Sequence, residues 1–135
     1  MTLTGGCLCG GVRYEVDGPL APIQLCHCGQ CRKAQGGPFG SNVLVARTAF
    51  RLLQGEWLLR EFRASPGRRR VFCAACGSPL FSQRDDAPEG LRLRAGTLDG
   101  DGPGLTIGFH IQTASKAAWW RIDDGLPQHP QAGPS

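Results

Sequence analysis

The cysteines of this chain gather into three short groups, and this grouping limits what the chain can fold around. Seven cysteines occur in 135 residues, in the segments Cys7-Leu8-Cys9, Cys26-His27-Cys28-Gly29-Gln30-Cys31 and Cys73-Ala74-Ala75-Cys76. Two thiolates one or two residues apart can reach one zinc ion from a single turn, and two such pairs complete a tetrahedral shell. The two outer pairs therefore predict a closed four-sulfur structural site. The three central cysteines predict a second zinc site with one open position, where chemistry can occur.

A secreted domain held by disulfides would also be rich in cysteine, but two features argue against it. The cysteine count is odd, and the first residues, Met1 to Gly6, lack the basic and apolar regions of a signal peptide. Pairs separated by one or two residues and flanked by glycine suit metal knuckles better than long crosslinks. For the central group, a redox-active thiol set or three reduced cysteines without metal stays an alternative.

The composition favours one β-rich domain with a modest core. The chain has 20 Gly and 10 Pro but only three Trp, one Tyr and six Phe, which indicates many turns and short elements. No apolar run approaches the roughly twenty residues that span a bilayer, and reduced thiolates suggest the cytoplasm. We therefore expect a single domain over residues 1–128, a disordered tail over residues 129–135 and no membrane partner.

The pattern of apolar residues predicts short strands and little helix. Strict alternation of apolar and charged residues marks half-buried strands, and turn residues bound each run. The predicted strands cover residues 10–16, 39–46, 50–53, 57–64, 91–95 and 106–112. One or two helical turns are expected over residues 28–35, and a surface loop over residues 83–90.

The net charge of +4 has one dense source, the run Arg68-Arg69-Arg70 just before the third cysteine group. A solvated strand edge is the first interpretation of this run. A surface that attracts a small anionic substrate is the second. Nucleic-acid binding ranks third, because no aromatic residues are interleaved with the arginines.

Several other side chains near the cysteines are candidates for binding. Lys33 follows the central group, and Lys116 lies near Trp119; either cation could receive a substrate carboxylate, although each is equally consistent with an ordinary surface position. His27 stands between two cysteines, where its side chain projects away from theirs, so it is a weak candidate ligand. His110 follows an apolar run and suits a core or pocket position better than a metal.

The cysteine groups, taken with their neighbours, resemble the glutathione-dependent formaldehyde-activating enzyme family. The matching segments are Gly6 to Tyr14, Cys26 to Lys33, Phe72 to Leu80, His110 to Ile111, Ser115 to Trp119 and Asp124 to Gln128. The similarity covers about residues 5–128. It implies an Mss4-like fold, mainly β, with twisted antiparallel sheets that carry zinc knuckles and little helix.

The same resemblance implies roles for all seven cysteines and a reaction. The structural zinc ligands would be Cys7, Cys9, Cys73 and Cys76, and the catalytic residues, which also bind a labile zinc, would be Cys26, Cys28 and Cys31. The family's reaction joins formaldehyde to the thiol of glutathione, giving S-hydroxymethylglutathione, and its reverse is that of a carbon–sulfur lyase.

We therefore expect a zinc enzyme whose partner is a small thiol such as glutathione and not a nucleic acid; a homodimer stays open. The residues assigned to contacts with the substrate are Lys33, His110, Lys116 and Trp119. The alternative is a zinc-stabilised binding module of the same fold without catalysis. The central cysteines favour the enzyme, because a purely structural module needs only the outer four.

Overall fold

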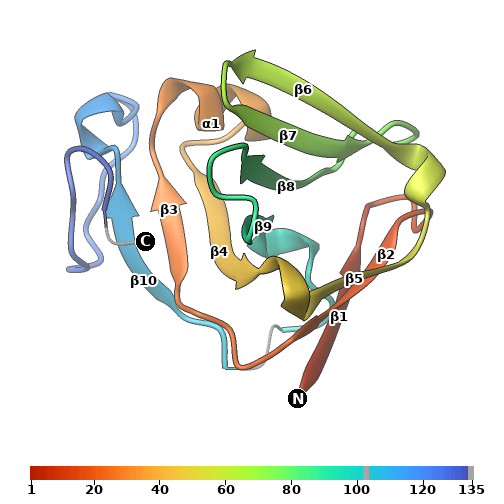
Figure 1. Cartoon of the computed structure of the whole chain (residues 1–135). Helices are drawn as coiled ribbons and strands as arrows, with labels where there is room; N and C mark the ends of the chain where they lie inside the picture. Colours follow the sequence, from red (N-terminus) through yellow and green to blue (C-terminus); the bar gives the residue numbers. More distant parts are fainter. Residues whose placement is uncertain (102–103, 134–135) are drawn as a thin grey trace.

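The protein folds into two β-sheets that meet at one side of the molecule (Figure 1). The computed structural model describes residues 1–101 and 104–133. The small sheet has the strand order β1-β2-β5, and the large sheet has the order β10-β3-β4-β9-β8-β7-β6. The strands are β1 (Thr2–Gly6), β2 (Arg13–Asp17), β3 (Ile23–Cys26), β4 (Gly40–Ala46), β5 (Phe50–Gln54), β6 (Leu59–Ser65), β7 (Arg68–Cys73), β8 (Pro79–Arg84), β9 (Gly90–Arg94) and β10 (Ile107–Ile111).

The mainly β fold with little helix is confirmed. Within the described ranges the single α-helix is α1 (Gly29–Gln35), and the other helical pieces are the 3₁₀ turns η1 (Arg47–Ala49), η2 (Glu56–Leu58), η3 (Ala95–Thr97) and η4 (Thr113–Ser115). None of these helices is both long and apolar enough to cross a membrane. Neighbouring strands pair antiparallel, as expected, except that β10 runs parallel to β3.

One face of the large sheet forms the hydrophobic core. The strand registers place Val43, Leu93, Phe81 and Val71 side by side across β4, β9, β8 and β7, and all four side chains are buried. Tyr14 and the rest of the small sheet pack into the same cluster. Side chains alternate between the two faces of a strand, so the apolar residues of β4, β7 and β9 define this core face.

The opposite face of the large sheet is polar, yet much of it is buried. The same registers place Asn42 beside Arg94, and Arg92 beside Ser82 and then Arg70. Of these five side chains, Asn42, Ser82 and Arg94 are at most 4% exposed. An antiparallel sheet commonly turns its polar face to water; here that face forms a second interior, and Cys26 at the end of β3 belongs to it.

The chain after β10 corrects the expectation of a disordered tail for residues 129–133. Gln128 forms a parallel bridge with His110, and the His129 N–H donates to the His110 carbonyl at 2.9 Å. The Gln112 N–H donates to the Gln131 carbonyl, also at 2.9 Å. This segment covers the outer edge of β10, whose backbone groups would otherwise lie open. Residues 134–135 of the predicted tail lie outside the described residues.

Candidate metal centres and substrate cavity

The outer four cysteines converge from two distant parts of the chain. Cys7 and Cys9 follow β1, whereas Cys73 ends β7 and Cys76 lies in the turn after it. Their sulfur atoms all lie within 4.8 Å of one another. The distance is 3.5 Å from Cys7 Sγ to Cys9 Sγ and 3.9 Å from Cys9 Sγ to Cys73 Sγ. A zinc ion about 2.3 Å from each sulfur in tetrahedral geometry needs sulfurs roughly 3.8 Å apart, so this set fits zinc.

Hydrogen bonds and a glycine in the turns around the outer set hold its sulfur atoms in position. The Val12 N–H donates to Cys7 Sγ at 3.2 Å, and the Ser78 hydroxyl lies 3.2 Å from Cys76 Sγ. That hydroxyl lowers the pKa of Cys76 to about 5. Gly77 has φ +77°, a left-handed conformation that only glycine adopts at little cost. At Cys7 and Cys76 these features lower the pKa and favour the thiolate, the form of cysteine that binds a metal.

The central three cysteines converge within one short stretch. Cys26 ends β3, Cys28 caps the N-terminus of α1 and Cys31 lies in its first turn. The Cys31 N–H donates to Cys28 Sγ at 3.2 Å, and the three sulfurs lie within 4.8 Å of one another. Hydrogen bonds from Cys26 and Cys31 lower the pKa of the Cys28 thiol. Three sulfurs leave one position of a tetrahedral zinc shell free, so this set fits a metal that also takes a ligand from outside.

Two arginines balance the charge of the central sulfurs. Arg70 Nη2 lies 3.7 Å from Cys31 Sγ. Arg94 is buried, and burial lowers its pKa to about 10, so it stays charged at neutral pH. Its Nη1 donates to Asn42 Oδ1 and, at 3.5 Å, to Ser82 Oγ. A buried cation beside thiolates offsets their negative charge.

We predict that Asn42→Ala destabilises the fold, because it removes the closest hydrogen-bond partner of the buried Arg94 guanidinium. The expected loss is about 2 kcal/mol in the free energy of unfolding, typical of a hydrogen bond to a charged group. Urea denaturation of both proteins measures it. Ser41→Ala, at the half-buried neighbouring position, is the matched control. Equal losses in the two variants would contradict this dependence of Arg94 on Asn42.

The two histidines near the central site bind each other and not the sulfurs. His27 Nε2 lies 2.8 Å from His110 Nδ1, and His110 Nε2 lies 2.8 Å from Asp124 Oδ2. A carboxylate only accepts, so His110 carries its proton on Nε2 and accepts from His27. Burial lowers the pKa of His27 to about 4, so it is neutral. The network anchors the central segment to the C-terminal segment, and His27 lies outside the cluster of candidate ligands.

A cavity of about 120 Å³ lies against the central site. Its wall includes Cys26 and Cys28, so two of the three central cysteines adjoin space that a small molecule can enter. The other lining residues are Gln24, Arg68, Arg84, Arg92, Ile111, Gln112, Ala132 and Gly133. The C-terminal segment therefore forms part of the cavity wall.

None of the four predicted substrate contacts lines this cavity. The Lys116 ammonium donates to the backbone carbonyls of Ala117 and Trp120, and Lys33 is exposed on α1. Both ring nitrogens of His110 are already in use. Trp119 is 69% exposed. The cations that face Cys26 and Cys28 are arginines, which corrects the expectation that the two lysines would do so.

The sequence predicted only part of the placement of the arginines on β9. The alternation Leu91-Arg92-Leu93-Arg94 predicts that both arginines face away from the core. It does not say that the opposite face is a second interior. Asp124 was singled out only as part of the closing segment of the family resemblance, and nothing local indicated its bond to His110.

Comparison with known proteins supports the family resemblance found in the sequence. Residues 2–115 match the family model described as "Glutathione-dependent formaldehyde-activating enzyme". The chain is 31% identical over 130 residues to a protein of Halomonas elongata named "Putative glutathione-dependent formaldehyde-activating enzyme"; the match covers 91% of this chain and 82% of that protein.

A solved structure shows a similar fold. The crystal structure of a Rhodobacter sphaeroides protein superposes with a TM-score of 0.64 at 25% sequence identity. The superposition covers 78% of this chain and 98% of the other. The arrangement of sheets described above is therefore shared with an experimentally determined protein.

Proposed function

Because this chain belongs to the glutathione-dependent formaldehyde-activating enzyme family, we propose that it joins formaldehyde to the thiol of glutathione. In this reaction the sulfur bonds to the formaldehyde carbon, and the thiol proton ends on the new hydroxyl of S-hydroxymethylglutathione. The reverse reaction breaks the same carbon–sulfur bond, which makes the protein a carbon–sulfur lyase. The observation that carries the proposal is a three-sulfur set of which two members, Cys26 and Cys28, line a cavity.

We propose zinc in both cysteine sets, with different purposes. The outer four sulfurs complete a closed shell and would serve the fold alone. Zinc bound by Cys26, Cys28 and Cys31 would lower the pKa of an incoming thiol and present it as thiolate at neutral pH.

The protein supplies the charge balance that such a site needs. Three thiolates around a divalent zinc leave one net negative charge, which would repel a fourth thiolate. Arg70 and Arg94 offset that charge from the sheet side of the cluster. His27 and His110 keep the segment between Cys26 and Cys28 in place without entering the cavity.

We also propose that the protein works in the cytoplasm, since none of the seven cysteines forms a disulfide and a reducing compartment keeps cysteines reduced. A nucleic-acid partner is not part of this proposal. Arg69 is engaged with Gln83 and Glu61 on one face of β7, and Arg70 with Cys31 on the other. The arginines of the run therefore project from both faces of β7, as alternation along a strand requires.

The proposal is tested by measuring how fast glutathione and formaldehyde interconvert with S-hydroxymethylglutathione. Exchange spectroscopy with ¹³C-labelled formaldehyde follows this rate, and metal analysis establishes two zinc ions per chain beforehand. We expect the zinc-loaded protein to accelerate the exchange, and the same protein stripped of its labile zinc not to. No acceleration by fully loaded protein would overturn glutathione and formaldehyde as the substrates.

A further inference from the structure

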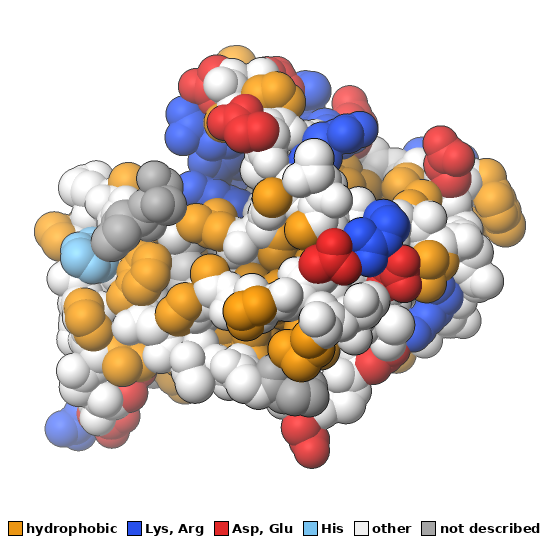
Figure 2. Space-filling view, turned by 60° about the horizontal axis from the view of Figure 1, so that its bottom comes forward, with side chains coloured by type: hydrophobic (Ala, Val, Ile, Leu, Met, Phe, Trp, Pro, Cys, Tyr) orange, Lys and Arg blue, Asp and Glu red, His pale blue; other side chains and the backbone are white. Residues whose placement is uncertain are grey.

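Three arginines from three adjacent strands converge on the cavity beside the central cysteines. Arg68 on β7 pairs directly with Arg84 on β8, and Arg92 lies on the next strand, β9. All three line the cavity that contains Cys26 and Cys28. On the face shown in Figure 2, Lys and Arg side chains gather in the upper part, where the surface recedes.

These arginines have few carboxylates near them, although the sulfurs of Cys26 and Cys31 act on Arg92 with opposite charge. Among residues 1–101 and 104–133, no carboxylate lies within ion-pair distance of Arg68 or Arg92. Arg84 pairs with Asp86, whose side chain is 68% exposed, and such surface pairs contribute little. Burial lowers the pKa of Arg92, and the nearby Arg68 charge adds to this effect. Cations held together without a counterion cost free energy, so the arrangement favours binding of an anion.

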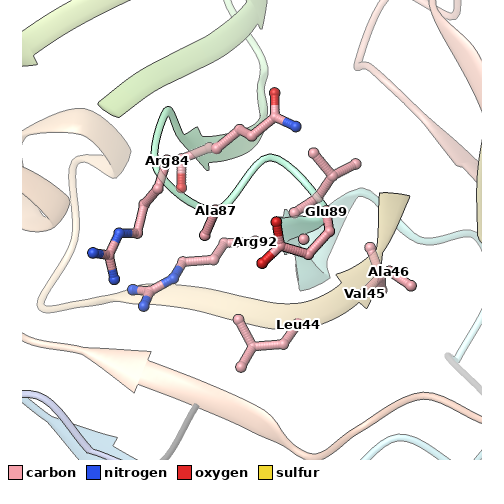
Figure 3. Close-up of a pocket in the computed structure, with 11 residues that line it drawn as sticks. Leu44, Val45, Ala46, Arg84, Ala87, Glu89 and Arg92 are labelled. Atoms are coloured by element: carbon pink, nitrogen blue, oxygen red, sulfur yellow. The ribbon is translucent and has the colours of Figure 1, made fainter. Parts of the chain in front are cut away.

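Arg84 and Arg92 also belong to a second, larger pocket. This pocket has a volume of about 420 Å³, and its apolar wall is formed by Leu44, Val45, Ala46, Ala87 and Leu91. Figure 3 shows the guanidinium groups of Arg84 and Arg92 at the same end of the pocket. Because Arg84 and Arg92 line both cavities, a ligand whose sulfur lies at Cys26 and Cys28 could reach either arginine from the smaller cavity.

We propose that Arg68, Arg84 and Arg92 form a carboxylate subsite, so that the thiol taken by this site must be anionic. This inference rests on the proposed function, because it places the thiol at the central cysteines. Arginine forms paired hydrogen bonds with a carboxylate, and a half-buried guanidinium without a partner suits that contact. The remainder of the thiol compound would extend along the larger pocket.

The test compares two small thiols that differ in charge. Calorimetry with zinc-loaded protein measures the dissociation constants of 3-mercaptopropionate and 2-mercaptoethanol. We expect the carboxylate-bearing thiol to bind about tenfold more tightly or better, the factor that loss of a charged hydrogen bond typically produces. Arg68→Gln and Arg92→Gln should each remove most of this preference, because each should weaken the binding of 3-mercaptopropionate more than that of 2-mercaptoethanol.

Arg69→Gln is the matched control, because it lies in the same run but points to the other face, over the Phe81 ring. Zinc content and thermal unfolding are recorded for every variant. If Arg92→Gln does not fold, the comparison of the two thiols relies on Arg68→Gln alone. Equal affinity of the wild type for both thiols, or a preference that survives both substitutions, would overturn the subsite while leaving the thiol site standing. If neither thiol binds to fully loaded protein, the proposed function fails and the subsite with it.

Discussion

Replacing Cys73 with serine is expected to abolish cooperative folding of the protein. Cys73 is fully buried at the end of β7, and its sulfur belongs to the set that joins this strand to the chain after β1. A structural zinc contributes about 10–16 kcal/mol in small zinc domains, which equals or exceeds the ~5–15 kcal/mol stability of an ordinary domain. Thermal unfolding followed by circular dichroism measures the loss, and metal analysis should find at most one zinc per chain.

Ala74→Ser is the matched control for this prediction, because residue 74 is exposed in the same turn and contributes no ligand. It should keep the zinc content and the unfolding temperature of the wild type. A Cys73→Ser protein that still unfolds cooperatively near the wild-type temperature would show that the outer set is not what stabilises the fold.

Replacing Cys28 with serine should remove activity and leave the fold intact. Cys28 is half-buried, and the cluster around it is small, consisting of Cys26, Cys31, Ile111 and Phe109. Loss of a residue that merely orients a metal ligand costs about 10–100-fold in activity or metal affinity, so loss of a ligand should cost at least ~100-fold. The measurement is the formaldehyde–glutathione exchange rate at equal protein concentration.

Gln30→Ala, on the exposed side of the same helix, provides the control for the activity measurement. The unfolding temperature of Cys28→Ser should stay within a few degrees of the wild type. If Cys28→Ser instead unfolded as Cys73→Ser is expected to, the division into a structural and a catalytic cysteine set would be wrong.

Local sequence pattern was sufficient to predict those elements whose defining residues lie close together in the chain. The spacing of the cysteines predicted both clusters, and alternation predicted β2 and β9 to within three residues. β1, β3, β7 and β8 were missed, because each is defined by its pairing with neighbouring strands rather than by an alternating pattern of its own.

The cations that line the cavity beside the central cysteines could not be predicted in the same way. Lys33 and Lys116 were chosen because they are close in sequence to Cys31 and Trp119, but strand register decides which cations reach the cavity. Arg68 and Arg92 are 24 positions apart in the chain, and Arg84 lies between them. The three meet only because β7, β8 and β9 pair in one particular register. The buried polar face likewise depends on the C-terminal segment closing over it, which no local pattern shows.

The two cysteine sets also differ in how much of the chain must be in place before each can form. The central ligands span residues 26–31, whereas Cys9 and Cys73 are 64 residues apart. Closing so long a loop costs more chain entropy than closing a turn, and contacts of large sequence separation form slowly. A growing chain would hold every central ligand while still lacking half of the outer ones. If both sets bind zinc as proposed, the central set would take up its metal before the outer set, and binding at the outer set would accompany the last stage of folding.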